Sequence, residues 1–273
     1  MIKVNLISVI KRYIKPGKPA GDNLKILRDD TFLVSYPRSG NTWMRFLLGN
    51  YLFGEKFDFL TKEKFIPAIR ANTNGELLKV PQPRILKSHS QYTPIYPKVI
   101  YIVRDPRDVI VSHYNWAKKN PNKKRDNTKL TFEQYAEIFF KGDFSFGGWN
   151  EHVIGWRSNS NKIKNGFLFI KYENLRNDTF NILKKTLEFL NIVPEENKII
   201  NAIEKTSFDQ MKKLEKKQQA ELKGIASPTG NIDFVGSGKS EWQFYLKDEI
   251  KERFKTYYGS TMMSLEYGKD INW

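Results

Sequence analysis

Short apolar runs alternate along the chain with segments of helical periodicity. The runs are rich in β-branched and aromatic residues, and four are candidate strands: residues 32–36, 84–87, 99–103 and 167–172. Between them, apolar residues recur every three or four positions, as they do on one face of a helix. This alternation predicts a single α/β domain with a central parallel sheet, flanking helices and right-handed crossovers.

Capping residues predict where three helices begin. Asp105 is a candidate N-cap, with Pro106 at the first helical position. Thr131 and Gln134 have the spacing of a capping box, and the Pro-Glu-Glu sequence at 194–196 opens a further helix. These starts place helices after the third strand and on both sides of the fourth.

The first 23 residues form a basic arm and linker, distinct from a domain over residues 24–273. The stretch "KPGKPAGDN" at 15–23 is rich in proline and glycine, as linkers are. Before it, Ile2, Leu6 and Val9 have helical spacing among lysines and an arginine. Such a helix could contact a membrane surface weakly, or pack on its own domain, and the second option is favoured. The interrupted apolar stretch and the lack of a small-residue cleavage site argue against a signal peptide.

Composition restricts the classes of function without choosing one. The 46 basic and 30 acidic residues give a formal charge of +16, which predicts an anionic partner. Nucleic acid, an anionic membrane, an acidic polysaccharide and a phosphorylated cofactor all fit. The absence of cysteine excludes disulfides and a thiolate nucleophile and fits a cytoplasmic location. With only three histidines, no metal site is expected.

Polar residues follow each candidate strand. "RSGNT" at 38–42 follows the first, Lys87 and His89 lie at the end of the second, Arg104 ends the third, and Tyr172 ends the fourth. Ligands of open α/β sheets bind outside the carboxyl ends of the strands. The pattern therefore predicts one binding site at this edge of the sheet.

The turn "YPRSGNTW" at 36–43 is typical of an anion-binding loop. Gly40 allows close approach of the backbone, Arg38 supplies charge, and Ser39 and Thr42 supply hydroxyl groups. An ordinary strand-to-helix turn is the alternative. The turn lacks the GxxxxGK[ST] spacing and an evident magnesium-binding aspartate, so metal-assisted phosphoryl transfer is poorly supported. "GSGKS" at 236–240 is no substitute, because Asp233 stands where that motif needs glycine.

Among the histidines, His89 is the best candidate for a catalytic base. Lys87 lies two residues before it and could stabilise charge on a transferred group. A purely structural role for His89 is the alternative. His113 lies on the apolar stripe of its predicted helix, so packing is its expected role.

Five segments in this order resemble sulfotransferases that use 3'-phosphoadenosine 5'-phosphosulfate (PAPS), and the resemblance spans about residues 24–258. "YPRSGNTW" resembles the family's 5'-phosphosulfate loop, YPKSGTTW, and "LKSHSQY" resembles its K-T-H segment. "YIVRDPRDVIVSHYNW" resembles the 3'-phosphate motif, while "FLFIKYENL" and "KTSFDQM" resemble nucleotide-contacting segments. "FGGWNEHVIGW" resembles a further family segment, which implies an acceptor-side role for His152.

The resemblance implies a P-loop nucleotide-binding-like fold and a transfer of sulfonate to an acceptor hydroxyl or amine. PAPS would be the donor, 3'-phosphoadenosine 5'-phosphate (PAP) the product, and no metal would be needed. The implied catalytic residues are His89 as base, with Lys87 and Arg38 stabilising charge. The implied cofactor-binding residues are Arg38, Ser39, Gly40, Asn41, Thr42, Trp43, Arg104, Ser112, Tyr172, Thr206, Phe208, Gly238 and Lys239.

The chain departs from the family pattern at four places. Arg38 replaces the usual lysine; it keeps the charge but cannot donate a proton. Asn41 replaces the first threonine of the loop. The late segment "FVGSGKSEW" keeps Trp242 but lacks the expected arginine, for which Lys239 or the glycine-rich backbone could compensate. The C-terminal dimer motif of many cytosolic members is also missing, so the oligomeric state stays open.

Two rival functions are a P-loop kinase-like phosphotransferase and a basic nucleic-acid-binding module. The missing lysine of the nucleotide triphosphatase loop argues against the first. Scattered basic residues without a recognition motif argue against the second, so no nucleic-acid partner is expected. The expected acceptor is a small molecule or a glycan.

Overall fold

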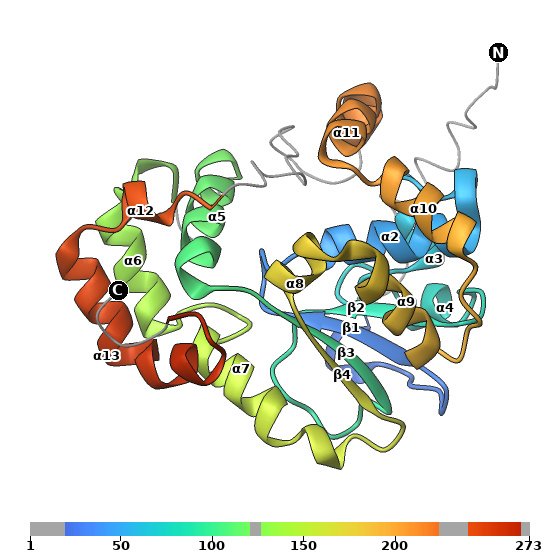
Figure 1. Cartoon of the computed structure of the whole chain (residues 1–273), viewed down its shortest axis with the longest axis horizontal. Coiled ribbons are helices and arrows are strands. Elements are labelled where there is room, and N and C mark those ends of the chain that lie inside the picture. Colours follow the sequence, from blue (N-terminus) through green and yellow to red (C-terminus); the bar gives the residue numbers. More distant parts are fainter. Residues whose placement is uncertain (1–19, 121–126, 224–239, 269–273) are drawn as a thin grey trace.

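A four-stranded parallel sheet forms the centre of the computed structural model, which describes residues 20–120, 127–223 and 240–268 (Figure 1). The strands are β1 (Thr31–Ser35), β2 (Ile85–Ser88), β3 (Lys98–Val103) and β4 (Phe167–Lys171). Their order is β2-β1-β3-β4, and every pair is parallel. The predicted fold class is confirmed, and each predicted strand agrees with an observed one to within one residue at each end.

The sheet is buried on both faces because successive side chains of a strand point to opposite sides. Phe32 and Val34 of β1 belong to one hydrophobic cluster, whereas Leu33 between them belongs to the other. In β3, Tyr101 and Ile102 divide in the same way. This explains the continuous apolar runs in the sequence, since both faces of each strand need apolar residues.

One face of the sheet is covered by helices that share a cluster with Leu33. In Figure 1 these helices lie above the sheet, with the short helices beside them. They are α2 (Asn41–Phe53), α9 (Thr179–Phe189), α10 (Glu196–Lys205) and α11 (Phe208–Lys223), and the short helices are α3 (Lys62–Phe65) and α8 (Tyr172–Asn177). Leu77 of the short helix α4 (Asn74–Leu77) belongs to the other cluster.

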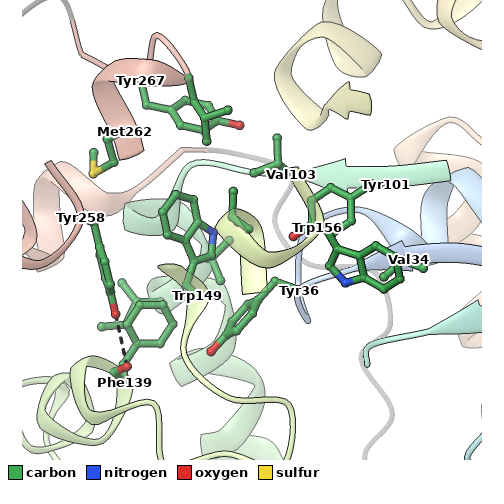
Figure 2. Close-up of a cluster of buried hydrophobic side chains, with 14 of the residues drawn as sticks. Val34, Tyr36, Tyr101, Val103, Phe139, Trp149, Trp156, Tyr258, Met262 and Tyr267 are labelled. Atoms are coloured by element: carbon green, nitrogen blue, oxygen red, sulfur yellow. Dashed lines mark hydrogen bonds between the residues drawn. The ribbon is translucent and has the colours of Figure 1, made fainter. Parts of the chain in front are cut away.

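The opposite face packs against an aromatic cluster. Figure 2 shows Tyr36, Tyr101, Trp149 and Trp156 meeting there, and all four are almost completely buried. Rings of this size contribute much of the area that drives folding. The helices on this side are α5 (Pro106–Lys119), α6 (Phe132–Lys141), α7 (Trp149–Ser158), α12 (Trp242–Tyr245) and α13 (Asp248–Ser264).

The predicted helix starts are confirmed. The Asp105 carboxylate accepts a bond from the Arg107 amide at 2.9 Å, with Pro106 in the first turn. Thr131 and Gln134 form both bonds of a capping box at the start of α6. α5 therefore begins directly after β3, which brings its first turns to the carboxyl edge of the sheet.

The predicted N-terminal arm lies outside the described residues, apart from the end of the linker. Residues 21–23 form a single turn of 3-10 helix. The proposed boundary between residues 23 and 24 stays a prediction. Within the described ranges, no helix is long and apolar enough to cross a membrane.

Candidate functional site

A cavity of about 1840 Å³ lies at the carboxyl edge of the sheet. It is lined by residues that follow each of the four strands, so the structure brings the predicted strand-end residues together. Ser39 is completely buried and is not among the lining residues. Gly238 and Lys239 lie outside the described residues. The predicted residues that line the cavity are Arg38, Gly40, Asn41, Thr42, Trp43, Lys87, His89, Arg104, Ser112, Tyr172, Thr206 and Phe208.

The loop between β1 and α2 presents the start of a helix to this cavity. Gly40 is the residue before the helix and has φ +92°, in the left-handed region. No side chain caps α2, so its first amide groups are not satisfied by a capping residue. A helix start with free amides and a positive dipole end favours an anion, here with Arg38 beside it.

Gly40 is required at its position for two reasons. Its positive φ disfavours any residue with a Cβ, and a Cβ there would lie 2.5 Å from Cδ2 of Tyr172. Gly40→Ala is therefore expected to lower the free energy of unfolding by about 1–3 kcal/mol, measured by denaturant titration. The matched control is Gly75→Ala, because Gly75 has ordinary φ and its nearest neighbour is 4.0 Å away. Equal stability of the two variants would contradict the argument.

Three residues from different segments are tied together at the loop. Arg38 Nε donates to Ser112 Oγ at 3.1 Å, and Arg104 Nη1 donates to the Arg38 carbonyl at 3.3 Å. The Arg104 guanidinium lies over the Tyr172 ring, 4.5 Å from its centroid. Buried Nε of Arg104 has no partner among the described residues. The site thus holds two arginines close together, an arrangement that suits a ligand with several negative charges.

His89 is positioned as a neutral base. Its Nδ1 lies 2.7 Å from the Ser35 carbonyl oxygen, which can only accept, so Nδ1 carries the proton. Burial, with a smaller effect from Lys87, holds the pKa of His89 well below its ordinary value. At neutral pH the ring is therefore uncharged, and Nε2 keeps the lone pair that can accept a proton.

Lys87 lies beside His89 on the same strand end. Burial is the main cause, and together with Arg45 and Arg38 it lowers the pKa of Lys87 to about 8, whereas Glu63 has the opposite effect. The ammonium group is consequently still mostly charged at pH 7, and its pKa depends on the charges of Arg45, Arg38 and Glu63 around it.

Two predicted ligand residues use their side chains within the protein. The Asn41 amide nitrogen donates to the Leu33 carbonyl at 3.1 Å and to Ser35 Oγ at 3.3 Å. Thr206 Oγ1 donates to the Ala202 carbonyl at 2.7 Å, while the Thr206 carbonyl accepts from Trp43 Nε1 at 3.2 Å. The Asn41 side chain therefore holds the loop, and the Thr206 carbonyl holds the Trp43 ring in place.

The other two histidines are engaged elsewhere. His113 is buried and bonds Tyr135 Oη through Nδ1 at 2.7 Å, in agreement with its predicted packing role. His152 is completely buried, bonds Tyr101 Oη at 2.8 Å and is not among the residues that line the cavity. Burial lowers their pKa values to about 3 and about 4. Only His89 of the three is both partly exposed and at the strand ends.

Several further charged residues line the cavity without having been predicted as site residues from sequence, among them Arg45, Lys62, Glu63 and Arg176. Arg45 is almost completely buried in α2, between the buried apolar residues Met44 and Phe46. In the sequence, the signal for this residue was a cation in the middle of an apolar helical stretch. The residues around it come from other segments, and their proximity is a result of the fold.

Comparison with known proteins agrees with this geometry. The sequence-family model of the sulfotransferase domain matches residues 28–266 of this chain. Rat sulfotransferase 1A1 is 27% identical over 98% of this chain and 96% of the relative. Flavonol 4'-sulfotransferase of Flaveria chlorifolia is 28% identical over 86% of this chain and 79% of the relative. The crystal structure of mouse sulfotransferase SULT7A1 complexed with PAP aligns with a TM-score of 0.71 at 26% identity, covering 92% of this chain and 90% of that one.

The chain has the α/β fold of the sulfotransferases, with its cavity at the carboxyl edge of the sheet. It belongs to the sulfotransferase family and is a sulfotransferase enzyme.

Proposed function

We propose that this enzyme transfers a sulfonate group from PAPS to an acceptor hydroxyl or amine and releases PAP. One observation carries the proposal: a neutral, partly exposed His89 shares one cavity with Lys87, Arg38 and Arg104. The site therefore combines a base for the acceptor with cations for an anionic donor. The PAP complex of mouse sulfotransferase SULT7A1 supports the choice of nucleotide.

The residues present fit such a donor. The start of α2 without a side-chain cap and the unpartnered Arg104 Nε are features that a multiply charged nucleotide would use. In our proposal the 5' side is held by the segment 38–42, and the 3'-phosphate by Arg104 and Ser112. The adenine would lie among the remaining predicted residues, which are Trp43, Tyr172, Thr206 and Phe208. When bound, PAPS supplies the sulfonate and a good leaving group.

The chain's own residues account for the remaining chemistry. His89 Nε2 accepts the acceptor proton as the acceptor oxygen or nitrogen bonds to sulfur, and the bond from sulfur to the 5'-phosphate oxygen breaks. Lys87 and Arg38 face the charge that develops on that oxygen. Arg38 cannot donate a proton, whereas Lys87, with its pKa of about 8, can. Arg104 and Ser112 position the far end of the donor, which aligns the reacting atoms.

The acceptor in this proposal is a small molecule or a glycan that carries a hydroxyl or an amine. Relatives are named for flavonols and for 3-beta-hydroxysteroids, which are hydroxyl-bearing small molecules. Family membership favours sulfonate transfer over the kinase-like and nucleic-acid-binding alternatives. A cytoplasmic location stays a prediction, and the N-terminal arm, for which membrane contact was the alternative to packing on its own domain, lies outside the described residues.

Nucleotide binding is the direct test. We expect calorimetry to show that PAP binds without magnesium and at least about tenfold more tightly than ATP with magnesium, because the loop lacks the triphosphatase lysine. A screen of phenols, steroids, amines and oligosaccharides with radiolabelled PAPS then identifies the acceptor class. Preference for ATP with magnesium would contradict the proposal and favour the kinase-like alternative.

A further inference from the structure

Glu63 on α3 joins three segments beside the cavity. Its Oε1 accepts from Arg45 Nη2 at 2.8 Å. Its Oε2 accepts from the Ala68 amide at 2.8 Å and from Asn72 Nδ2 at 2.9 Å. Both carboxylate oxygens are therefore engaged, and the Glu63 side chain is only 18% exposed. A carboxylate with three such partners fixes the positions of the groups that donate to it.

The segment that Glu63 holds is paired with the main chain of Lys87. The Lys87 amide donates to the Pro67 carbonyl at 2.8 Å, and the Ile69 amide donates to the Lys87 carbonyl at 3.1 Å. Ala68 and Lys87 thus form a parallel bridge at the end of β2. Glu63 binds the Ala68 amide, so it acts on the residue directly opposite Lys87.

Titratable groups from four segments face Lys87. Arg45 on α2 and Arg38 on the first loop are cations, His89 on the same strand end is neutral, and Glu63 is the carboxylate among them. Burial opposes the ionisation of Glu63, but Arg45, the Ala68 amide and Lys62 outweigh it, and the pKa of Glu63 is lowered to about 2. Among the described residues that line the cavity, the other acidic ones are Asp108 and Glu241. Asp108 lies near Arg104, with 3.8 Å between Oδ2 and Nη2.

We propose that Glu63 is a positioning residue for Lys87. It fixes the segment that pairs with the Lys87 main chain, and its negative charge offsets Arg45 and Arg38, so that Lys87 stays charged at the donor site. The inference rests on the proposed function, because it takes the Lys87 ammonium to face the 5' side of the nucleotide. A simple structural role, in which Glu63 only neutralises the buried Arg45, is the rival explanation.

The test measures PAP affinity against pH in Glu63→Gln, alone and combined with Lys87→Met. In the unaltered enzyme, affinity should fall as the pH rises through about 8, where Lys87 loses its charge. Without the Glu63 charge, this fall should begin about half a pH unit or more lower. In the Lys87→Met background, Glu63→Gln should change PAP affinity less than about twofold at any pH. Glu55→Gln, which removes an exposed carboxylate paired with Lys205, is the matched control.

Glu63→Asp provides a second route if Glu63→Gln does not fold. It keeps the charge but draws the carboxylate away from Ala68, so affinity should fall severalfold with Lys87 present and hardly at all in Lys87→Met. Equal losses with and without Lys87, or an unshifted pH dependence in Glu63→Gln, would overturn the inference and favour the structural role. If the unaltered enzyme binds no PAP at any pH, it is the proposed function that fails.

Discussion

Replacing His89 with alanine is expected to reduce sulfonate transfer by about 10²–10⁴-fold, the range typical of a lost general base. PAP affinity should change little, since the proposed nucleotide contacts come from other residues. The physical reason is the fixed tautomer: the Ser35 carbonyl holds the proton on Nδ1, so Nε2 is the acceptor. Transfer is measured with radiolabelled PAPS, and PAP affinity by calorimetry.

The pH dependence gives a second readout for His89. Its pKa lies well below the ordinary value, so the base is already neutral at pH 7 and loses its function only as the pH falls through that lowered pKa. The unaltered enzyme should therefore keep its transfer rate when the pH falls from 7 to about 6.5, the ordinary pKa of histidine.

The matched control is His113→Asn, which can keep the bond to Tyr135 Oη. His113 also lines the cavity, but its Nδ1 is engaged with that hydroxyl. We expect less than a tenfold change in transfer for this variant. A comparable loss in both variants, or full activity in His89→Ala, would remove His89 from the role of base.

Replacing Lys87 with methionine is expected to lower kcat by about 10²–10³-fold, as the loss of one charge-stabilising group typically does. Methionine keeps an unbranched apolar chain but removes the ammonium that faces the leaving oxygen. The KM for PAPS should rise less than kcat falls, because the proposal places Lys87 where charge develops during transfer.

Lys87→Met should also make the protein more stable at pH 7. The folded-state pKa of Lys87 is about 8, below the ordinary 10.5. The charged Lys87 therefore lowers the free energy of unfolding below pH 8. As the pH rises from about 8 to 10.5, the unfolded chain binds more protons than the folded one, and this penalty disappears. The stability advantage of the variant should therefore be largest below pH 8 and vanish above 10.5. A variant that is both inactive and less stable at pH 7 would indicate a structural role for Lys87.

The sequence alone was sufficient for the architecture of this protein. Its strands are buried on both faces, so their apolar runs are continuous and easy to locate. The starts of α5 and α6 depend on local capping bonds between residues a few positions apart. A parallel sheet collects its strand ends at one edge, so the predicted site residues could be grouped before any contact was known.

Tertiary structure decided how those residues act on one another. The resemblance assigned Arg38 to the 5' side of the nucleotide and Ser112 to the 3'-phosphate, and only the fold shows that the two side chains are joined by a hydrogen bond. His152 looked like an acceptor-side residue, but it is enclosed beside Tyr101. The side chains of Asn41 and Thr206 bond to the protein itself.

The bonds of Glu63 with Arg45, and of its segment with Lys87, were invisible in the sequence for the same reason. They join side chains and strand edges that no local pattern relates. Periodicity and capping are properties of neighbours along the chain, and the sequence therefore determined the elements and the edge where they meet. The charge on Lys87 and the free nitrogen of His89 depend on burial and on partners from distant segments, and only the packed fold sets those.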